Sequence, residues 1–261
     1  MQKHPFHLVD SSPWPLFSSI ALGGFTTGLV GWFHSYLYAD FLALISFISL
    51  IYVSIVWWRD VLRESVYQGH HTRAVQTGIR YGMILFIVSE VMLFAGLFWA
   101  FAHSSLAPTI EISGVWPPRG IEAFDPFGIP FLNTLILLSS GASVTWAHYA
   151  ILLGSRKQGI LSLSITILLA AIFTCFQAYE YISAPFTISD SVYGSIFYML
   201  TGLHGLHVIV GTIFLAVCLY RLKKSELRPD HHLAFELAAL YYHFVDIVWL
   251  ILFISLYYWG S

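Results

Sequence analysis

The chain is poor in charge and in cysteine. Only 10% of its 261 residues are Asp, Glu, Lys or Arg and 57% are hydrophobic, whereas a soluble domain carries about 25% charged residues. So few charges cannot solvate the surface of a globular protein of this length. The 2 cysteines, Cys175 and Cys218, lie in apolar stretches, where a thiol packs as a small apolar group. This composition excludes a soluble globular domain and leaves the redox compartment undefined.

The apolar stretches also lack the alternation of apolar and polar residues over about ten positions that marks a membrane β-strand. In lipid, backbone N–H and C=O groups must be hydrogen-bonded within the protein, so helices are the remaining solution. Seven runs have the roughly 18 residues that a membrane-crossing helix needs. They are Leu16–Phe33, Phe41–Trp58, Tyr81–Ser105, Ile129–Leu153, Ile160–Tyr179, Ser191–Tyr220 and Leu233–Tyr258. We predict an all-α integral membrane protein with seven transmembrane helices.

Neither an internal repeat nor a low-complexity linker interrupts the chain. We therefore predict one polytopic membrane domain over residues 1–261, with two helices within about 16–58 and five helices within about 81–258. Only 7 residues separate the first two runs, and so short a connection makes these two helices an antiparallel hairpin. In the first run, Gly24 and Gly28 form a small-xxx-small pattern that allows close helix packing.

Basic residues are strongly biased to one side of the membrane. When the seven runs alternate in direction, 11 of the 12 fall on the side of the N-terminus and Arg119 falls opposite. The 11 are Lys3, Arg59, Arg63, Arg73, Arg80, Arg156, Lys157, Arg221, Lys223, Lys224 and Arg228. This bias predicts an N-terminus in the cytoplasm or an organelle matrix and a C-terminus on the other side. The N-terminal stretch has neither an Arg-rich presequence nor a signal-peptide apolar region, so we expect no cleaved leader.

Nucleic-acid binding and autonomous catalysis are not supported by the sequence. The net charge is −2, and basic residues confined to one set of loops favour anionic lipid headgroups over nucleic acid. The chain has no recognisable nucleophile with its base, phosphate-binding glycine loop or dinucleotide fingerprint.

Glu90 is the most informative single residue within the apolar runs, because it is ionisable and its helical neighbours, such as Phe86 and Phe94, are apolar. It lies 10 residues beyond Arg80, or about 15 Å along a helix that rises ~1.5 Å per residue. A bare carboxylate at that depth is costly, so we expect Glu90 to hold its proton or to have a polar partner on another helix. Proton handling and a purely structural hydrogen bond both remain open.

The last run carries a polar stripe. His232, Glu236, His243 and Asp246 follow one another at spacings of 4, 7 and 3 residues, which places them on one face of a helix. Such a stripe must face protein or water, and burial against neighbouring helices is the simpler interpretation. His243 lies about as deep as Glu90, so the spacing also allows an interhelical pair between them.

His204 and His207 form an i,i+3 pair that resembles half of a metal or haem site. Two ligands on one helical turn do not make a metal site. His103 and His148 are further imidazoles, but no Cys, Asp or Glu stands beside the pair at a ligand spacing. We therefore expect packing and interhelical hydrogen bonds there, and no metal. The loop pairs His70–His71 and His231–His232 are expected to contact headgroups rather than metal.

A series of short motifs runs through the chain in order. It comprises Ser12–Leu16, Trp57–Val61, Gly69–His71, Arg80–Phe86, His103–Pro108, Trp116–Pro118, Thr145–His148, Ala184–Asp190, Gly202–His207 and Tyr257–Ser261. Together these motifs closely resemble subunit III of cytochrome c oxidase, in its mitochondrial form. The resemblance covers loops and apolar runs alike, so shared hydrophobicity does not account for it.

The resemblance implies a subunit of respiratory complex IV, which reduces O2 to water with electrons from cytochrome c and pumps protons. It implies a two-helix hairpin and a five-helix bundle separated by a V-shaped, lipid-filled cleft. It also implies that this chain has no catalytic residues and no cofactor of its own, with haem a and copper in partner subunits. Subunit I is the expected main contact, with subunit II and accessory subunits as further partners.

For single residues, the resemblance implies phospholipid contacts and a proton-related role. The candidate headgroup contacts are Trp58, Arg59, Arg63, Glu64, His71, Arg221, Lys224 and His231. Glu90, within Ser89–Val91, matches the buried glutamate of the family's third helix, and the subunit is expected to stabilise the catalytic subunit and support proton uptake. The implied location is the mitochondrial inner membrane, with the N-terminus in the matrix and the C-terminus in the intermembrane space.

Two other functions compete with this interpretation. Glu90 and the stripe of the last run also fit an autonomous proton or ion transporter, because ionisable residues inside a membrane are often functional. Transporters commonly contain inverted repeats and broken helices, and neither is visible in this sequence. A haem or metal carrier would rest on His204 and His207 alone.

Overall fold

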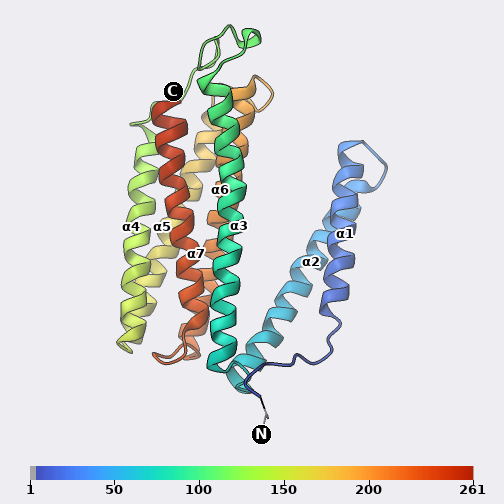
Figure 1. Cartoon of the computed structure of the whole chain (residues 1–261), viewed down its shortest axis with the longest axis vertical. Helices are drawn as coiled ribbons and strands as arrows, with labels where there is room; N and C mark the ends of the chain where they lie inside the picture. The colour runs from blue at the N-terminus through green and yellow to red at the C-terminus, as the bar shows by residue number, and fades with distance from the viewer. Residues whose placement is uncertain (1–3, 261) are drawn as a thin grey trace. The chain divides into compact units, whose positions relative to one another are not determined.

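Seven long helices make up most of the protein, as the sequence predicted. The computed structural model describes residues 4–260, so Lys3 and Ser261, which belong to predictions made above, lie outside the described residues. The helices are α1 (Trp14–Phe33), α2 (Ala39–Leu62), α3 (Arg73–Leu106), α4 (Ile129–Leu152), α5 (Arg156–Ser183), α6 (Val192–Lys223) and α7 (Leu233–Leu252) (Figure 1). By length and composition, all seven are able to cross a membrane.

Several helices extend beyond the apolar runs. The helix α3 begins at Arg73, 8 residues before the predicted start at Tyr81, and α5 spans Arg156–Ser183 rather than Ile160–Tyr179. Two helices continue as π-helical segments, α2 through Arg63–Tyr67 and α7 through Phe253–Trp259. A helix still satisfies the hydrogen bonds of the backbone where the chain leaves the apolar layer. Hydropathy alone therefore underestimates the length of a helix.

The chain divides into two compact units, one ending at Ile79 and one beginning at Arg80. The predicted lipid-filled cleft concerns the placement of the two units and stays a prediction.

The first unit is an antiparallel hairpin of α1 and α2, which confirms the predicted pairing of the first two runs. Its helices approach closely at glycine. A Cβ added to Gly28 would lie 2.5 Å from the backbone nitrogen of Ala43, and one added to Gly24 would lie 2.5 Å from Ser46 Oγ. The small-xxx-small pattern therefore does pack this hairpin.

The base of the hairpin is tied by polar contacts around Asp60. Its carboxylate accepts a hydrogen bond from Trp14 Nε1 at 2.8 Å and lies 3.0 Å from Arg59 and 3.6 Å from Arg63. His7 Nε2 lies 3.6 Å from Glu64, so the segment before α1 contacts the end of α2.

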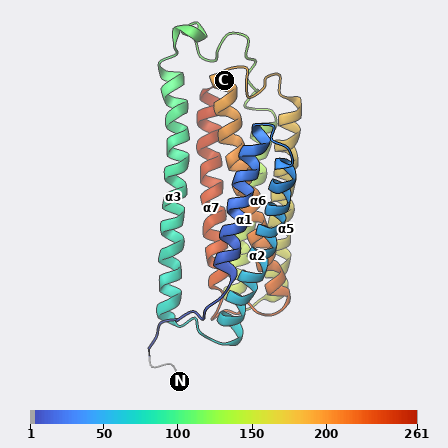
Figure 2. The same cartoon turned by 90° about the vertical axis from the view of Figure 1, so that its right-hand side faces the viewer.

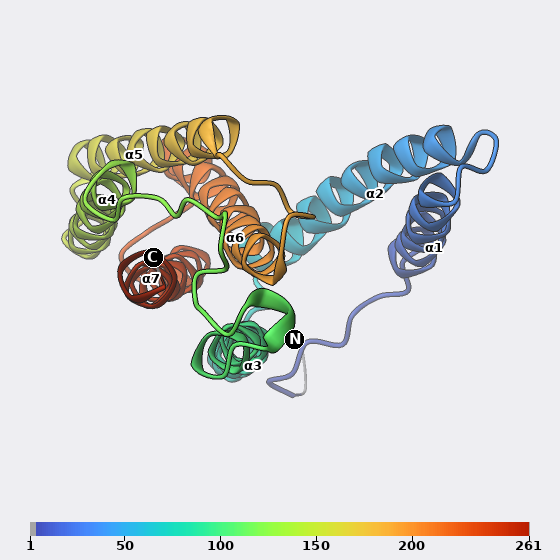
Figure 3. The same ribbon diagram turned by 90° about the horizontal axis from the view of Figure 1, so that it is seen from above.

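The second unit is a bundle of α3, from Arg80 onward, and α4 to α7, in which α7 is the most buried helix. Trp249, Tyr242 and Phe235 on α7 are buried. The ring of Trp249 lies 4.8 Å from that of Phe173 on α5, and its Nε1 donates a hydrogen bond to Thr134 Oγ1 on α4 at 3.0 Å. Figure 3 shows α4, α5, α6 and α7 packed around one another.

By contrast, α3 stands at the edge of this bundle (Figures 2 and 3). Long side chains join it to its neighbours. Phe94 lies 5.2 Å from the ring of His207 and 6.1 Å from that of Phe244, and Phe86 lies 6.1 Å from that of Tyr241. Outward-facing Leu85, Met92 and Trp99 leave an apolar surface suited to lipid or a partner helix.

We predict that Gly28→Ala destabilises the hairpin by about 1–3 kcal/mol, because the new methyl group meets the backbone of α2. Gly23→Ala is the matched control on the same helix, since a Cβ there meets nothing within 4 Å. Thermal unfolding of the detergent-solubilised protein measures both. Equal stability of the two variants would show that the close approach at Gly28 is not needed.

Candidate functional site

Glu90 on α3 has the interhelical partner that the sequence predicted, and the partner is His207 on α6. Glu90 Oε2 lies 2.7 Å from His207 Nε2, and the side chains are 17% and 10% exposed. His207 comes from the i,i+3 histidine pair, whereas the sequence analysis had considered His243 as the partner. The rotation of α3 and α6 about their axes decides this pairing.

The hydrogen bonds of His207 determine where its protons lie. His207 Nδ1 is 2.7 Å from the carbonyl oxygen of Leu203, and because a carbonyl only accepts, Nδ1 carries a proton. In neutral imidazole Nε2 is then unprotonated, so a 2.7 Å contact with a carboxyl oxygen requires one further proton between the two groups. The pair is either a protonated Glu90 with neutral His207 or a carboxylate with an imidazolium. In both cases its net charge is zero.

Aromatic rings surround this pair. The ring of His207 lies 5.2 Å from Phe94 and 6.3 Å from Tyr241. These rings keep water away from most of the contact, which strengthens the electrostatic interaction within it. The arrangement can hold one proton between two side chains on different helices.

The polar stripe of α7 divides between two neighbouring helices. Glu236 forms an ion pair with Arg80 on α3 at 2.9 Å and lies 3.1 Å from His232. Farther along α7, Asp246 faces Gly141 on α4 and lies 3.7 Å from His243. The predicted face is therefore present, but its two halves contact different helices.

His204 and His207 point to different partners. His204 Nε2 lies 3.3 Å from the carbonyl oxygen of Val245 on α7. The His204 ring lies 5.8 Å from Phe173 and 5.2 Å from Trp249. Its Nδ1 is buried without a hydrogen-bond partner among the described residues. This geometry is that of a packed core histidine.

Comparison with known proteins decides the family. The family model described as "Cytochrome c oxidase subunit III" matches residues 4–261. The chain belongs to the cytochrome c oxidase subunit III family.

Relatives in this family match the chain over its whole length. The proteins named "Cytochrome c oxidase subunit 3" from Prototheca wickerhamii and Marchantia polymorpha are 65% and 60% identical, over 100% of this chain and 100% and 98% of their own lengths. The protein of that name from Danio rerio is 56% identical over 100% of this chain and 99% of its own length. The resemblance inferred from the motifs is thus confirmed.

The candidate lipid contacts of this subunit III chain differ in their surroundings. Arg221 is 4% exposed and its Nε lies 3.3 Å from Glu226, so this guanidinium already has a carboxylate partner. Lys224 is exposed, with its Nζ 5.6 Å from the Tyr220 ring centre. The role of the whole set stays a prediction. It comprises Trp58, Arg59, Arg63, Glu64, His71, Arg221, Lys224 and His231.

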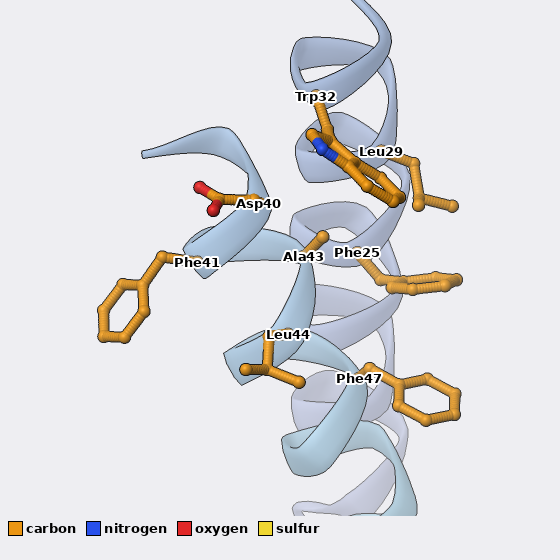
Figure 4. A pocket seen from close by; sticks show the side chains of 8 residues that line it. All are labelled: Phe25, Leu29, Trp32, Asp40, Phe41, Ala43, Leu44 and Phe47. Carbon is orange, nitrogen blue, oxygen red and sulfur yellow. The ribbon is translucent and has the colours of Figure 1, made fainter. Parts of the chain in front are cut away.

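The hairpin unit also contains an open, apolar groove of about 400 Å³ between α1 and α2. Figure 4 shows its lining, with Phe25 and Phe47 from the two helices lying on the same side. Their ring centres are 5.4 Å apart, and Asp40 is the charged residue in the lining. Such a surface suits an acyl chain better than a polar ligand.

The sequence pattern did not predict a buried carboxyl on α5. Glu180 is fully buried and accepts a hydrogen bond from the hydroxyl of Tyr257, near the C-terminus, while Gln177 Nε2 lies 3.5 Å from it. The predicted run ended at Tyr179, one residue too early. An ionisable residue directly beside the end of an apolar run was the available signal.

We predict that Tyr257→Phe destabilises the bundle by about 1–3 kcal/mol, because it leaves the Glu180 carboxyl without its hydroxyl donor. Tyr258→Phe removes an exposed hydroxyl from the next residue and serves as the control. Thermal unfolding in detergent is the measurement. If both variants unfold like the parent protein, Glu180 does not depend on Tyr257.

Proposed function

We propose that this chain is a non-catalytic core subunit of cytochrome c oxidase in the mitochondrial inner membrane. The oxidase reduces O2 to water with electrons from cytochrome c while pumping protons. In this proposal haem a and copper belong to partner subunits, and the chain contacts subunit I, with subunit II and accessory subunits as further partners. It stabilises the catalytic subunit, binds phospholipid and supports proton uptake. Full-length identity to mitochondrial-type relatives supports this assignment.

The observation that carries the proton-related part is the Glu90–His207 pair. A contact of 2.7 Å between a carboxyl oxygen and an imidazole nitrogen, each on a different helix, holds one proton in a mostly water-free position. Imidazole and carboxyl groups are the usual proton carriers within membrane proteins. The pair joins the edge helix α3 to α6, so it also favours assembly of the helix bundle.

Charge distribution within the bundle supports the proposed orientation. The basic residues Arg80, Arg156, Lys157, Arg221, Lys223, Lys224 and Arg228 lie where α3, α5 and α7 begin and where α4 and α6 end. Arg119 lies in the loop at the other end. By the bias of basic residues toward the matrix side, the C-terminus faces the intermembrane space.

We predict that Glu90→Gln leaves assembly intact and changes steady-state electron transfer by less than about twofold, while making turnover inactivation modestly faster. Gln keeps a hydrogen bond to His207 Nε2 but cannot exchange a proton. The measurement is oxygen consumption by the purified oxidase over repeated turnover, together with a pH-difference infrared spectrum.

Glu122→Gln, in the exposed loop after α3, is the control for this variant. Loss of assembly in Glu90→Gln would show that the carboxyl is structural. If no haem a copurifies with the chain, the assignment to the oxidase would be overturned and the autonomous transporter would be favoured.

Phospholipid binding has its own test. We predict that Lys224→Ala weakens retention of anionic phospholipid about fivefold, which corresponds to about 1 kcal/mol for one exposed charge near the headgroups. Arg119→Ala removes a charge at the opposite end of the bundle and should have no such effect. Phosphate analysis of lipid retained through a detergent series measures both, and equal retention would count against Lys224 as a headgroup contact.

A further inference from the structure

Three potential metal ligands come together at the basic end of the bundle. They are His148 near the end of α4, His232 directly before α7, and Glu236 in the first turn of α7. One ligand atom from each side chain lies within 4.8 Å of the other two. His232 and Glu236 belong to the polar stripe of the last run. His148 belongs to the motif Thr145–His148, which has no role in the proposed function.

His232 is oriented as a metal ligand would be. Its Nδ1 lies 3.1 Å from the carbonyl oxygen of Arg228, so Nδ1 carries a proton, and in the neutral imidazole Nε2 presents a lone pair. That Nε2 atom is buried and has no hydrogen-bond partner among the described residues, although Glu236 Oε1 is 3.1 Å away. Metal-binding histidines typically donate their other N–H to a backbone carbonyl in this way.

Glu236 is held in a similar manner. Its Oε2 accepts hydrogen bonds from Arg80 Nη2 at 2.9 Å and Nε at 3.2 Å. This leaves Oε1 directed toward His232. The Arg80 guanidinium orients the carboxylate and compensates its charge when the metal is absent, and hydrogen-bonded carboxylates of this kind are common around metal sites.

His148 completes the set and has room to move. It is partly exposed, and its ring lies 5.9 Å from that of His232 and 5.8 Å from that of Phe235. Ligand atoms around tetrahedral zinc lie about 3.3 Å apart, given metal–ligand bonds of about 2.0–2.1 Å. A shift of the His148 ring nitrogen by about 1.5 Å, the difference between 4.8 Å and the tetrahedral spacing, closes the remaining gap.

We propose that His148, His232 and Glu236 form a binding site for a divalent transition metal, with Zn2+ the preferred ion. Two imidazoles and one carboxylate are a donor set that zinc favours, and the partly exposed side of the site leaves the fourth position to water. Bound metal would join α4 to α7 and, through Arg80, brace α3. The sequence pattern had instead predicted no metal, with packing and headgroup contacts in this region.

The test uses the full-length protein, purified with its native partners in mild detergent and freed of loosely bound metal with a chelator. Equilibrium dialysis against 65Zn2+ measures the stoichiometry and Kd of wild type, His148→Asn and Glu236→Gln. His103→Asn, an exposed histidine at the other end of α3, is the matched control. We expect one zinc site to weaken about 10- to 100-fold in both ligand variants and to be unchanged in the control.

His148→Asn is the decisive variant, because it leaves the Arg80–Glu236 ion pair in place. A second readout is zinc-edge X-ray absorption, which should report two imidazole ligands in wild type and fewer in His148→Asn. Zinc should also raise the Tm of wild type and of His103→Asn only. Identical zinc affinity in wild type and His148→Asn, or no zinc bound by wild type, would overturn the proposal.

Discussion

A polar side chain inside an apolar helix must find its partner within the protein, and this requirement organises the bundle. Tyr242 reaches Ser140 at 2.8 Å, Ser143 reaches Thr166 at 2.7 Å, and Trp249 donates to Thr134 at 3.0 Å. Each of these bonds joins two helices. In hydrocarbon there is no water to replace a lost partner, so the bonds select one rotation of each helix.

The edge helix α3 lacks close packing and is attached to the bundle by long side chains and polar contacts. Its outward side chains are apolar, and its inward contacts depend on long residues. Two polar contacts, Arg80 with Glu236 and Glu90 with His207, lie near the end and near the middle of the helix. They set the position of α3 along the bundle axis, whereas the rings of Phe86 and Phe94 set its rotation.

Hydropathy was sufficient to predict the seven helices and the hairpin, because both depend on local composition and loop length. Helix ends were less predictable, since α3 and α5 continue through polar residues at the surface. Partners were the least predictable feature. The stripe from His232 to Asp246 gave the correct face of α7, but whether that face meets α3 or α4 depends on rotations that one sequence does not specify.

The two polar contacts of α3 also differ in chemistry. Arg80 and Glu236 form an ion pair in which the side chains are 47% and 29% exposed. Glu90 and His207 instead share one proton in a mostly buried place. The contact needs that proton, because without it a carboxylate oxygen and an imidazole lone pair would face each other across 2.7 Å.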